Sequence, residues 1–355
     1  MSIYSDLKAA WHTSVLRDIE DMSVDGLLPV PVHMYLILSD LCNQDCHFCH
    51  HRMSGGLAVE QFEENGSRNP NRRIPTDKAK EILIDFGRMG GRAVQFTGGG
   101  EPLVHPDFYK IAEFALDADL ECALVTNASK ALDYDVLKRF EWVRVSLDAG
   151  NASDYAKIRK AKPEMFDAVL RRVQDLAEHC PETTVGVSFV VTNDNKDGIV
   201  EAARYAEAAG AAYIRYSAVF SDAGPGYYDD AEDIRNRIRS AVGLVPGIKQ
   251  INLFDSFMAD LDSGAPDYKQ CGFQHFAVYV GGNLKVYRCC TTSYTAQGEV
   301  GDLTNRSFND WFFDDETLKR YQSFDARTCN VCHFNAKNRV INYLTIGEPD
   351  HVNFV

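Results

Sequence analysis

Apolar residues recur along this chain with two periods, and the two alternate between residues 33 and 220. Short runs of apolar and β-branched residues, such as 121–126, predict strands, whereas 76–89 places apolar residues at steps of three and four, as one face of a helix does. Thr76 is a suitable N-cap for that helix, and Gly90-Gly91 ends it. The strands expected from this pattern cover 33–39, 92–97, 121–126, 142–148, 184–191 and 212–220.

Six strands that alternate with helical segments predict an α/β fold. Such a pattern forms a parallel sheet covered by helices, and right-handed crossovers curl the sheet toward a barrel. We therefore expect a partial (β/α)6 TIM-like barrel, in which chemistry is carried by side chains where strands end and loops begin.

The pattern changes after about residue 268. Two strand-like runs flank Gly281-Gly282, which predicts a β-hairpin, and a helix is expected over about 310–324. This region should form a small C-terminal α+β module. The expected organisation is an N-terminal extension (1–32), a barrel core (33–228), a connecting helical region (229–267), the C-terminal module (268–332) and a tail (333–355).

The bulk composition is that of an ordinary globular protein. The chain has 355 residues, of which 45% are hydrophobic and 25% charged. No apolar run approaches the ~20 residues that span a bilayer, and the N-terminus lacks an apolar signal core, so we expect no membrane partner and a cytoplasmic location. The net charge of −14 disfavours duplex nucleic acid as a partner.

Ten cysteines are unusual for such a chain. Disulfides are rare in the cytosol, so metal ligation is the better explanation. Cys42, Cys46 and Cys49 have the spacing C-x3-C-x2-C, and three thiolates so close together can hold three irons of a cubic cluster and leave the fourth iron open. A zinc site remains an alternative, because histidines 47, 50 and 51 lie next to the triplet.

This triplet resembles the signature of the radical S-adenosylmethionine (SAM) superfamily. The resemblance implies a 4Fe–4S cluster on Cys42, Cys46 and Cys49, whose open iron binds the amino and carboxylate groups of SAM. Reductive cleavage of SAM then yields methionine and a 5′-deoxyadenosyl radical. Phe48 occupies a position that is often aromatic in this family and whose backbone contacts the adenine.

Further SAM contacts are implied at the later strand ends. Residues 97–102, Thr-Gly-Gly-Gly-Glu-Pro, resemble the GGEP motif of the family, whose carboxylate can bind the amino group of SAM. Arg159 resembles a helical arginine that pairs with the SAM carboxylate, although a solvated surface arginine is an equal alternative. Ala128 replaces the glycine of a T-N-G turn, and Asp148 could cap a turn instead of binding. The cofactor-binding residues implied by the resemblance are Phe48, Gly99, Gly100, Glu101, Asn127, Ser146, Arg159 and Asn193.

Five cysteines gather in the C-terminal module. Their arrangement around the hairpin resembles the Twitch domain, a short form of the SPASM extension, which implies one auxiliary 4Fe–4S cluster. Cys289 ends Val-Tyr-Arg-Cys, similar to the family's V-Y-P-C, so Cys289 rather than Cys290 is expected to be a ligand. A structural zinc site with four thiolates is the alternative. The expected ligands are Cys271, Cys289, Cys329 and Cys332.

These features favour an enzyme that abstracts a hydrogen atom from a C–H bond of a small polar substrate, such as a nucleoside, amino acid or sugar derivative. Oxidation through the auxiliary cluster is the expected outcome, with an electron donor of the flavodoxin or ferredoxin type. Alternatives are a redox-neutral isomerase or epimerase on a modified nucleoside or amino acid derivative, a peptide (RiPP) maturase, and a non-catalytic metal-binding module. Arg159 and Cys290 are the expected catalytic residues, the latter as a thiol that returns hydrogen.

Overall fold

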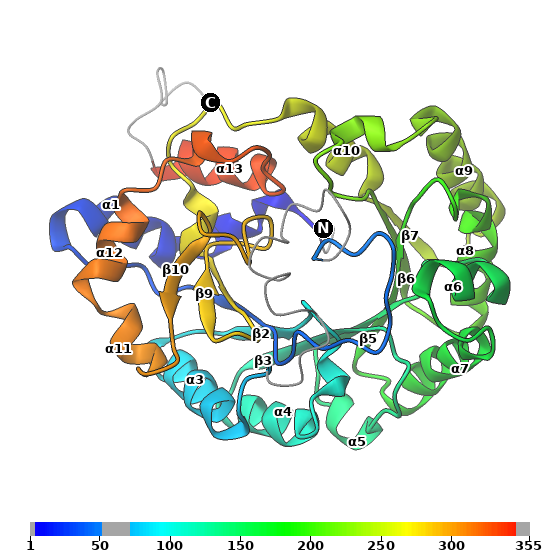
Figure 1. The fold of residues 1–355 in the computed structure, drawn as a ribbon, viewed down its shortest axis with the longest axis horizontal. Helices are drawn as coiled ribbons and strands as arrows, with labels where there is room; N and C mark the ends of the chain where they lie inside the picture. The colour runs from blue at the N-terminus through cyan, green and yellow to red at the C-terminus, as the bar shows by residue number, and fades with distance from the viewer. Residues whose placement is uncertain (1–3, 52–71, 346–355) are drawn as a thin grey trace.

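The computed structural model describes residues 4–51 and 72–345 of the chain. Its strands form one sheet, in the order β10-β9-β8-β1-β2-β3-β4-β5-β6-β7. From β1 to β7 the neighbouring strands run parallel and follow the order of the sequence, so the sheet curves around a centre (Figure 1). These strands are β1 (His33–Leu36), β2 (Ala93–Phe96), β3 (Glu121–Thr126), β4 (Trp142–Ser146), β5 (Thr184–Val190), β6 (Tyr213–Ser217) and β7 (Lys249–Asn252).

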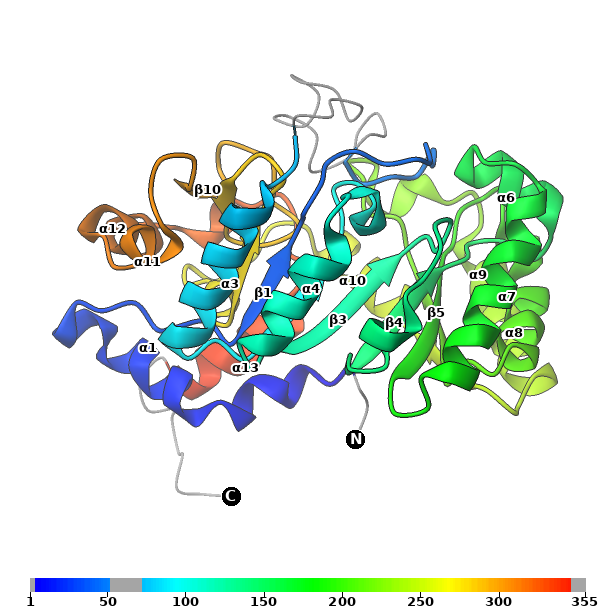
Figure 2. The ribbon, with the colours of Figure 1, turned by 90° about the horizontal axis from the view of Figure 1, so that it is seen from below.

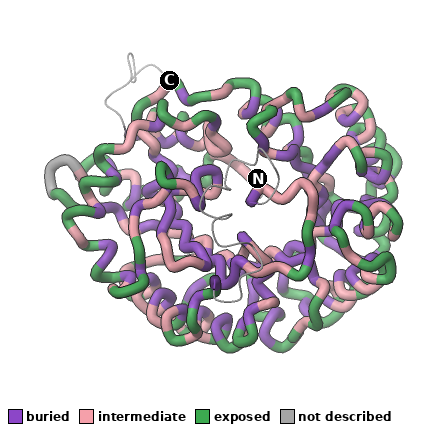
Figure 3. The backbone as a smooth tube through the Cα atoms, viewed as in Figure 1, coloured by how far each residue is buried: buried purple, intermediate pink, exposed green. Residues whose placement is uncertain are grey.

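Helices cover the outer face of this curved sheet, and the tube in Figure 3 shows exposed residues mainly on the outer rim. The expected TIM-like partial barrel is confirmed. The helices that follow its strands are α3 (Thr76–Met89), α4 (Phe108–Asp117), α5 (Tyr134–Leu137), α6 (Ala152–Arg159), α7 (Glu164–His179), α8 (Ile199–Ala208), α9 (Ala231–Leu244) and α10 (Phe254–Ser263).

The core lies between the sheet and these helices. Alternate strand residues point outward, so Phe96 of β2 packs edge-on against Phe108 of α4 with ring centroids 5.4 Å apart. The apolar face expected for α3 is buried, including Phe86. A Cβ on Gly91 would lie 2.4 Å from the Phe86 ring, which explains why glycine follows the end of this helix.

The connecting region contains a strand that the pattern did not indicate. Residues 229–267 were expected to be helical, and they form α9 and α10, but β7 lies between them and pairs with β6. Only Ile251 is buried in β7, whereas Lys249 and Asn252 are exposed. A short polar strand at the sheet edge has no apolar alternation to reveal it.

The predicted hairpin is confirmed as β8 (Ala277–Val280) and β9 (Lys285–Tyr287), and β10 (Glu299–Asp302) pairs with β9. β8 also pairs in parallel with β1, so the hairpin extends the barrel sheet on its β1 side. The single helix expected over 310–324 is two helices, α11 (Phe308–Phe312) and α12 (Asp315–Gln322). Asp314 divides them because its carboxylate accepts a hydrogen bond from the N–H of Glu316 and caps α12.

The two ends of the described chain pack together. η1 (Asp6–Trp11) and α1 (Thr13–Asp25) contact α13 (Asn335–Thr345), which forms part of the expected tail. Figure 2 shows α1 and α13 on the side of the barrel opposite the loop that follows β1. Residues 346–355 of the tail lie outside the described part. In the portions 4–51 and 72–345, no helix is long and apolar enough to cross a membrane.

Candidate active site

The glycine-rich segment after β2 packs directly against the chain that leads into the first three cysteines. The N–H of Gly100 donates to the carbonyl oxygen of Ser39 at 3.0 Å, and the N–H of Glu101 donates to that of Leu41 at 3.0 Å. A Cβ on Gly100 would lie 2.2 Å from the Leu41 oxygen, so only glycine allows this approach. Gly99 is buried in the same turn. The two predicted motifs therefore meet at Leu41, immediately before Cys42.

Glu101 joins the ends of β2 and β3. Its buried carboxylate accepts hydrogen bonds from the Thr126 hydroxyl at 2.6 Å, from the Leu103 N–H at 3.2 Å and from the Asn127 N–H at 2.8 Å. Burial raises the pKa of Glu101, and these hydrogen bonds oppose that shift. Both carboxylate oxygens are thus engaged by the chain itself, and the contact of Glu101 with SAM stays a prediction.

Asn127 connects this turn to the first cysteine. Its Nδ2 donates to Asn43 Oδ1 at 3.0 Å and lies 4.0 Å from Cys42 Sγ. The next residue, Ala128, has φ +48°, a left-handed conformation that glycine adopts more readily than alanine. This conformation is consistent with the predicted resemblance of the turn to T-N-G.

Arg159 is buried, so the alternative of a solvated surface arginine is wrong. Its Nη2 pairs with the buried carboxylate of Asp148, and Nη1 donates to Gln44 Oε1 at 3.1 Å and to Cys46 Sγ at 3.6 Å. Asp148 also accepts a hydrogen bond from the N–H of Val190 at 2.7 Å. The arginine thereby links the end of α6, the ends of β4 and β5, and the cysteine loop.

The other predicted SAM contacts lie at neighbouring strand ends. Ser146 on β4 faces Ser188 on β5, with 3.4 Å between the hydroxyl oxygens. Asn193 is bonded to the segment after β6, because its Nδ2 donates to the Tyr227 carbonyl at 2.9 Å. Phe48 is half-buried beside His47, with ring centroids 5.6 Å apart.

The four cysteines predicted to be metal ligands in the C-terminal module line one cavity. Cys271 precedes the hairpin, Cys289 follows it, and Cys329 and Cys332 come from the segment after α12. Cys332 Sγ accepts hydrogen bonds from the Tyr268 hydroxyl at 3.4 Å and from Asn338 Nδ2 at 3.5 Å. Cys290 does not appear among the described residues that line this cavity.

The donor chemistry of this cavity fits a metal group with thiolate ligands, because four cysteines line an otherwise largely apolar wall. Burial raises the pKa of Cys329 to about 12, and Cys289 and Cys332 add to the shift, so the free thiol of Cys329 is neutral at pH 7. The enclosed space is about 30 Å³, so a bound group would move these side chains apart. No group of three or more His, Cys, Asp or Glu in the described chain is arranged to hold a metal ion.

A family model for the radical SAM superfamily matches residues 36–206, from β1 into α8. Mycofactocin maturase MftC of Mycolicibacterium smegmatis is 27% identical over 320 residues, which cover 87% of this chain and 77% of that protein. The chain belongs to the radical SAM superfamily. It is an enzyme of that superfamily, as the cysteine triplet predicted.

Other comparisons cover different parts of this radical SAM enzyme. AdoMet-dependent heme synthase of Methanosarcina barkeri is 24% identical over 198 residues, which span 54% of this chain and about half (51%) of that protein. The crystal structure of Streptococcus suis SuiB bound to S-adenosylmethionine superposes with a TM-score of 0.62 at 14% identity, over 91% of this chain and 75% of that chain. The latter likeness establishes the shared fold.

His50, next to the radical SAM cysteines, makes a contact that the sequence did not predict. The His50 ring lies near enough to the backbone of Phe220, after β6, and of Cys290, after β9, for both to influence its pKa. Burial lowers the pKa of His50. This histidine therefore bridges the first cysteine loop and the hairpin module, and no spacing in the sequence indicates that contact.

Cys290 lies on the inner side of the sheet, apart from the lining of the second cavity. It packs with Tyr35 against a cluster that includes Tyr279, and the Tyr35 and Tyr279 rings stack with centroids 5.4 Å apart. Burial, reinforced by Cys289, raises the pKa of the Cys290 thiol, so it is protonated at pH 7. A protonated thiol suits the predicted hydrogen-donor role, which stays a prediction.

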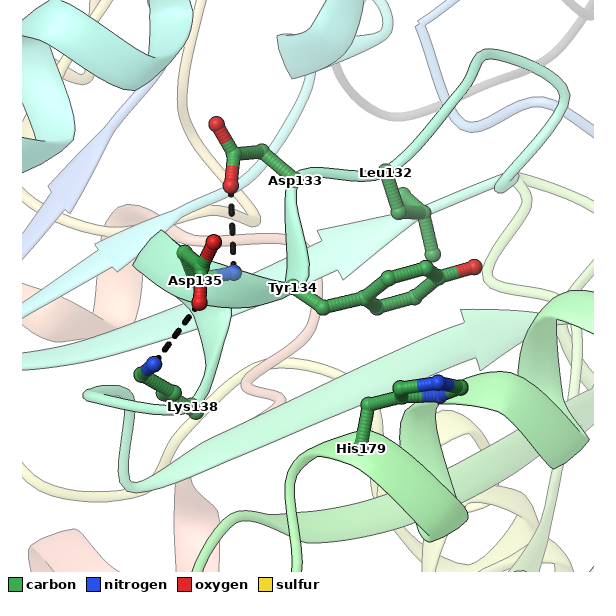
Figure 4. Close-up of a pocket in the computed structure, with 6 residues that line it drawn as sticks. All are labelled: Leu132, Asp133, Tyr134, Asp135, Lys138 and His179. Atoms are coloured by element: carbon green, nitrogen blue, oxygen red, sulfur yellow. Dashed lines mark hydrogen bonds and ion pairs between the residues drawn. The ribbon is translucent and has the colours of Figure 1, made fainter.

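A pocket of about 460 Å³ on the outer surface contains none of the predicted site residues. Figure 4 shows it beside α5 and the end of α7, where the Tyr134 ring stacks on His179 with centroids 5.2 Å apart. Asp135 and Lys138 form an exposed ion pair at 2.7 Å. The pocket is lined by solvated surface side chains, and we assign no radical chemistry to it.

Proposed function

We propose that this enzyme holds a 4Fe–4S cluster through Cys42, Cys46 and Cys49, and that SAM binds beside it at the ends of β2 to β5. The support is geometric: Gly100 packs on Leu41, Asn127 reaches Cys42, and Arg159 reaches Cys46. When bound, the cluster supplies the electron that cleaves SAM to methionine and a 5′-deoxyadenosyl radical. The chain's part is to position SAM and substrate and to keep water away.

The second metal site is proposed at Cys271, Cys289, Cys329 and Cys332. The single observation that carries the two-cluster function is that these four thiols, drawn from three segments, line one cavity. Cys290 is left outside it and packs against the cluster that contains Tyr279, Tyr287 and Tyr294. The family resemblance favours an auxiliary 4Fe–4S cluster in this cavity over zinc.

The reaction is proposed to be an oxidation. The substrate would give one hydrogen atom to the 5′-deoxyadenosyl radical. A cluster held by Cys271, Cys289, Cys329 and Cys332 would supply the acceptor for one electron from the substrate radical, and a base would take its proton. The product is two hydrogens lighter than the substrate, and 5′-deoxyadenosine forms in equal amount. In the redox-neutral alternative, the substrate radical takes a hydrogen atom from the Cys290 thiol, and the product has the mass of the substrate. One electron from the flavodoxin- or ferredoxin-type donor and one proton then restore the thiol from the Cys290 thiyl radical.

For the substrate, we place a peptide in a maturation reaction ahead of a free small molecule. The support is the 27% identity to a maturase over 87% of this chain. A small polar or nucleoside-like substrate is the alternative, because other relatives are named as a GTP 3′,8-cyclase and a heme synthase. An electron donor of the flavodoxin or ferredoxin type and a cytoplasmic location complete the proposal.

The test is anaerobic reconstitution followed by iron and zinc counts and by reduction with dithionite in the presence of SAM. The expected result is about eight irons per chain, which is two cubes, with release of 5′-deoxyadenosine. Alanine at Cys42, Cys46 or Cys49 should remove about four irons and all SAM cleavage. Cys122→Ala is the matched control, because Cys122 is buried on β3 and its thiol donates to the backbone carbonyl of Leu120. About four irons with bound zinc would refute the second cluster.

A further inference from the structure

Among the described residues that line the four-cysteine cavity, Arg288 has the only charged side chain. It stands between the end of β9 and Cys289, and only 6% of its surface is exposed. Its Nη1 donates to Gln274 Oε1 at 2.7 Å, and its Nη2 donates to the carbonyl oxygen of Arg320 at 2.7 Å. The guanidinium also lies over the Phe324 ring, 4.2 Å from the centroid. These contacts hold it rigidly in the cavity wall.

No carboxylate in the described chain pairs with this cation, since both of its hydrogen-bond acceptors are neutral. Its Nε is buried and has no hydrogen-bond partner. A buried charge without a counter-charge is strongly unfavourable. Arg288 lines the same cavity as Cys271, Cys289 and Cys329. The counter-charge that Arg288 lacks is therefore expected from the cysteines of this cavity once they are thiolates.

We propose that Arg288 is a positioning residue that raises the reduction potential of the cluster in this second site. The proposal rests on the proposed function, because it requires four thiolates and a cluster there. Reduction of such a site by one electron adds a negative charge, and a fixed buried cation stabilises the more negative form. Arg288 thereby favours transfer of an electron from the substrate radical to this cluster. The proton of the substrate radical goes to a base. The cluster gains the electron, and the substrate is oxidised.

Two variants change the charge at this position in different ways. Arg288→Gln removes the cation, whereas Gln274→Glu keeps Arg288 and places a carboxylate against its Nη1, so that the charge is cancelled with little change in shape. Arg320→Gln is the matched control, since it removes a cation of the same module whose side chain is exposed and pairs with Glu316 at 2.7 Å. Each is made in a full-length chain with alanine at Cys42, Cys46 and Cys49, so that a single cluster is titrated.

The measurement is an iron count followed by a dithionite titration monitored by electron paramagnetic resonance. Arg288→Gln and Gln274→Glu should each lower the equilibrium constant for one-electron reduction by about tenfold or more, which is about 59 mV. Arg320→Gln should shift it much less. Unchanged potentials in both variants at full iron load would overturn the role of Arg288.

Two other results separate the possible failures. Loss of iron in both Arg288→Gln and Gln274→Glu, but not in Arg320→Gln, would show that Arg288 serves cluster loading and would also overturn the proposal. A parent chain that binds no iron in this background would refute the second cluster itself, and with it the proposed function rather than the role of Arg288 alone.

Discussion

Arg159 donates from Nη1 to the sulfur of Cys46 at 3.6 Å while its Nη2 pairs with Asp148. Both charged side chains are buried, so removal of Arg159 leaves the Asp148 carboxylate buried without its counter-charge. We expect Arg159→Met to lower the free energy of unfolding by about 3–5 kcal/mol and to impair iron binding at the first three cysteines. Urea denaturation and an iron count test this.

The matched control for that prediction is Lys157→Met on the same helix. Lys157 pairs with Asp194 at 2.9 Å, but both side chains are largely exposed. An exposed pair contributes roughly 0.2–1 kcal/mol, so this variant should stay near the wild type. Equal losses in the two variants would contradict the structural role of Arg159.

Gly100→Ala tests the packing of the glycine-rich turn on the cysteine loop. The added Cβ would lie 2.2 Å from the backbone oxygen of Leu41, which cannot yield without moving the chain ahead of Cys42. We expect a loss of about 1–3 kcal/mol in stability and a clear loss of SAM-dependent 5′-deoxyadenosine formation. Gly243→Ala is the control, because its Cβ meets nothing within 4 Å in α9. It should be neutral or stabilise by up to about 1 kcal/mol.

Cys289 and Cys290 are adjacent in sequence but differ in the structure, since only Cys289 lines the cavity with the other three cysteines. Cys289→Ala should therefore reduce the iron content from about eight to about four per chain. Cys290→Ala should keep the full iron content. If Cys290 returns hydrogen, Cys290→Ala should also lose product while 5′-deoxyadenosine still forms. Loss of about four irons in Cys290→Ala but not in Cys289→Ala would show that Cys290 is the ligand.

Tyr4 gives the protein a pH dependence in the alkaline range. Burial by itself raises the pKa of Tyr4, but the positive charges of Arg144 on β4 and Arg215 on β6 lower it by more. The pKa of Tyr4 therefore falls from 10.0 to about 8. The folded state therefore releases the phenol proton at lower pH than the unfolded state. The stability from this residue is gained as pH rises through about 8 and is complete above about 10, at about 2–3 kcal/mol.

Urea denaturation near pH 7 and near pH 9.5 checks this expectation. The advantage of the wild type over Tyr4→Phe should widen with pH. Tyr343→Phe serves as the control, because Tyr343 is 64% exposed on α13. A constant difference between Tyr4→Phe and the wild type at both pH values would contradict the depressed pKa.

The sequence predicted best those helices and strands whose bounds follow from the spacing of apolar residues within the element itself. The helix over 76–89 and the strand over 121–126 have the predicted bounds, because the apolar period of each is local. β7 was missed because its residues are mostly polar and it is defined by pairing with β6. The pairing of β8 with β1 was also not predicted, since His33 and Ala277 become neighbours only when the barrel has formed.

For the site, the sequence by itself determined the family, the order of the motifs and the residue types that can bind iron. These are properties of local spacing, and C-x3-C-x2-C places three thiols on one loop whatever surrounds it. The resemblance already favoured Cys289 over Cys290. Only the tertiary structure decided that Arg159 is buried at Cys46, that Cys289 lines one cavity with the other three cysteines, and that Arg288 lies beside them with no carboxylate partner among the described residues. Burial, charge pairing and the direction of a side chain depend on segments far apart in the sequence, so no local pattern records them.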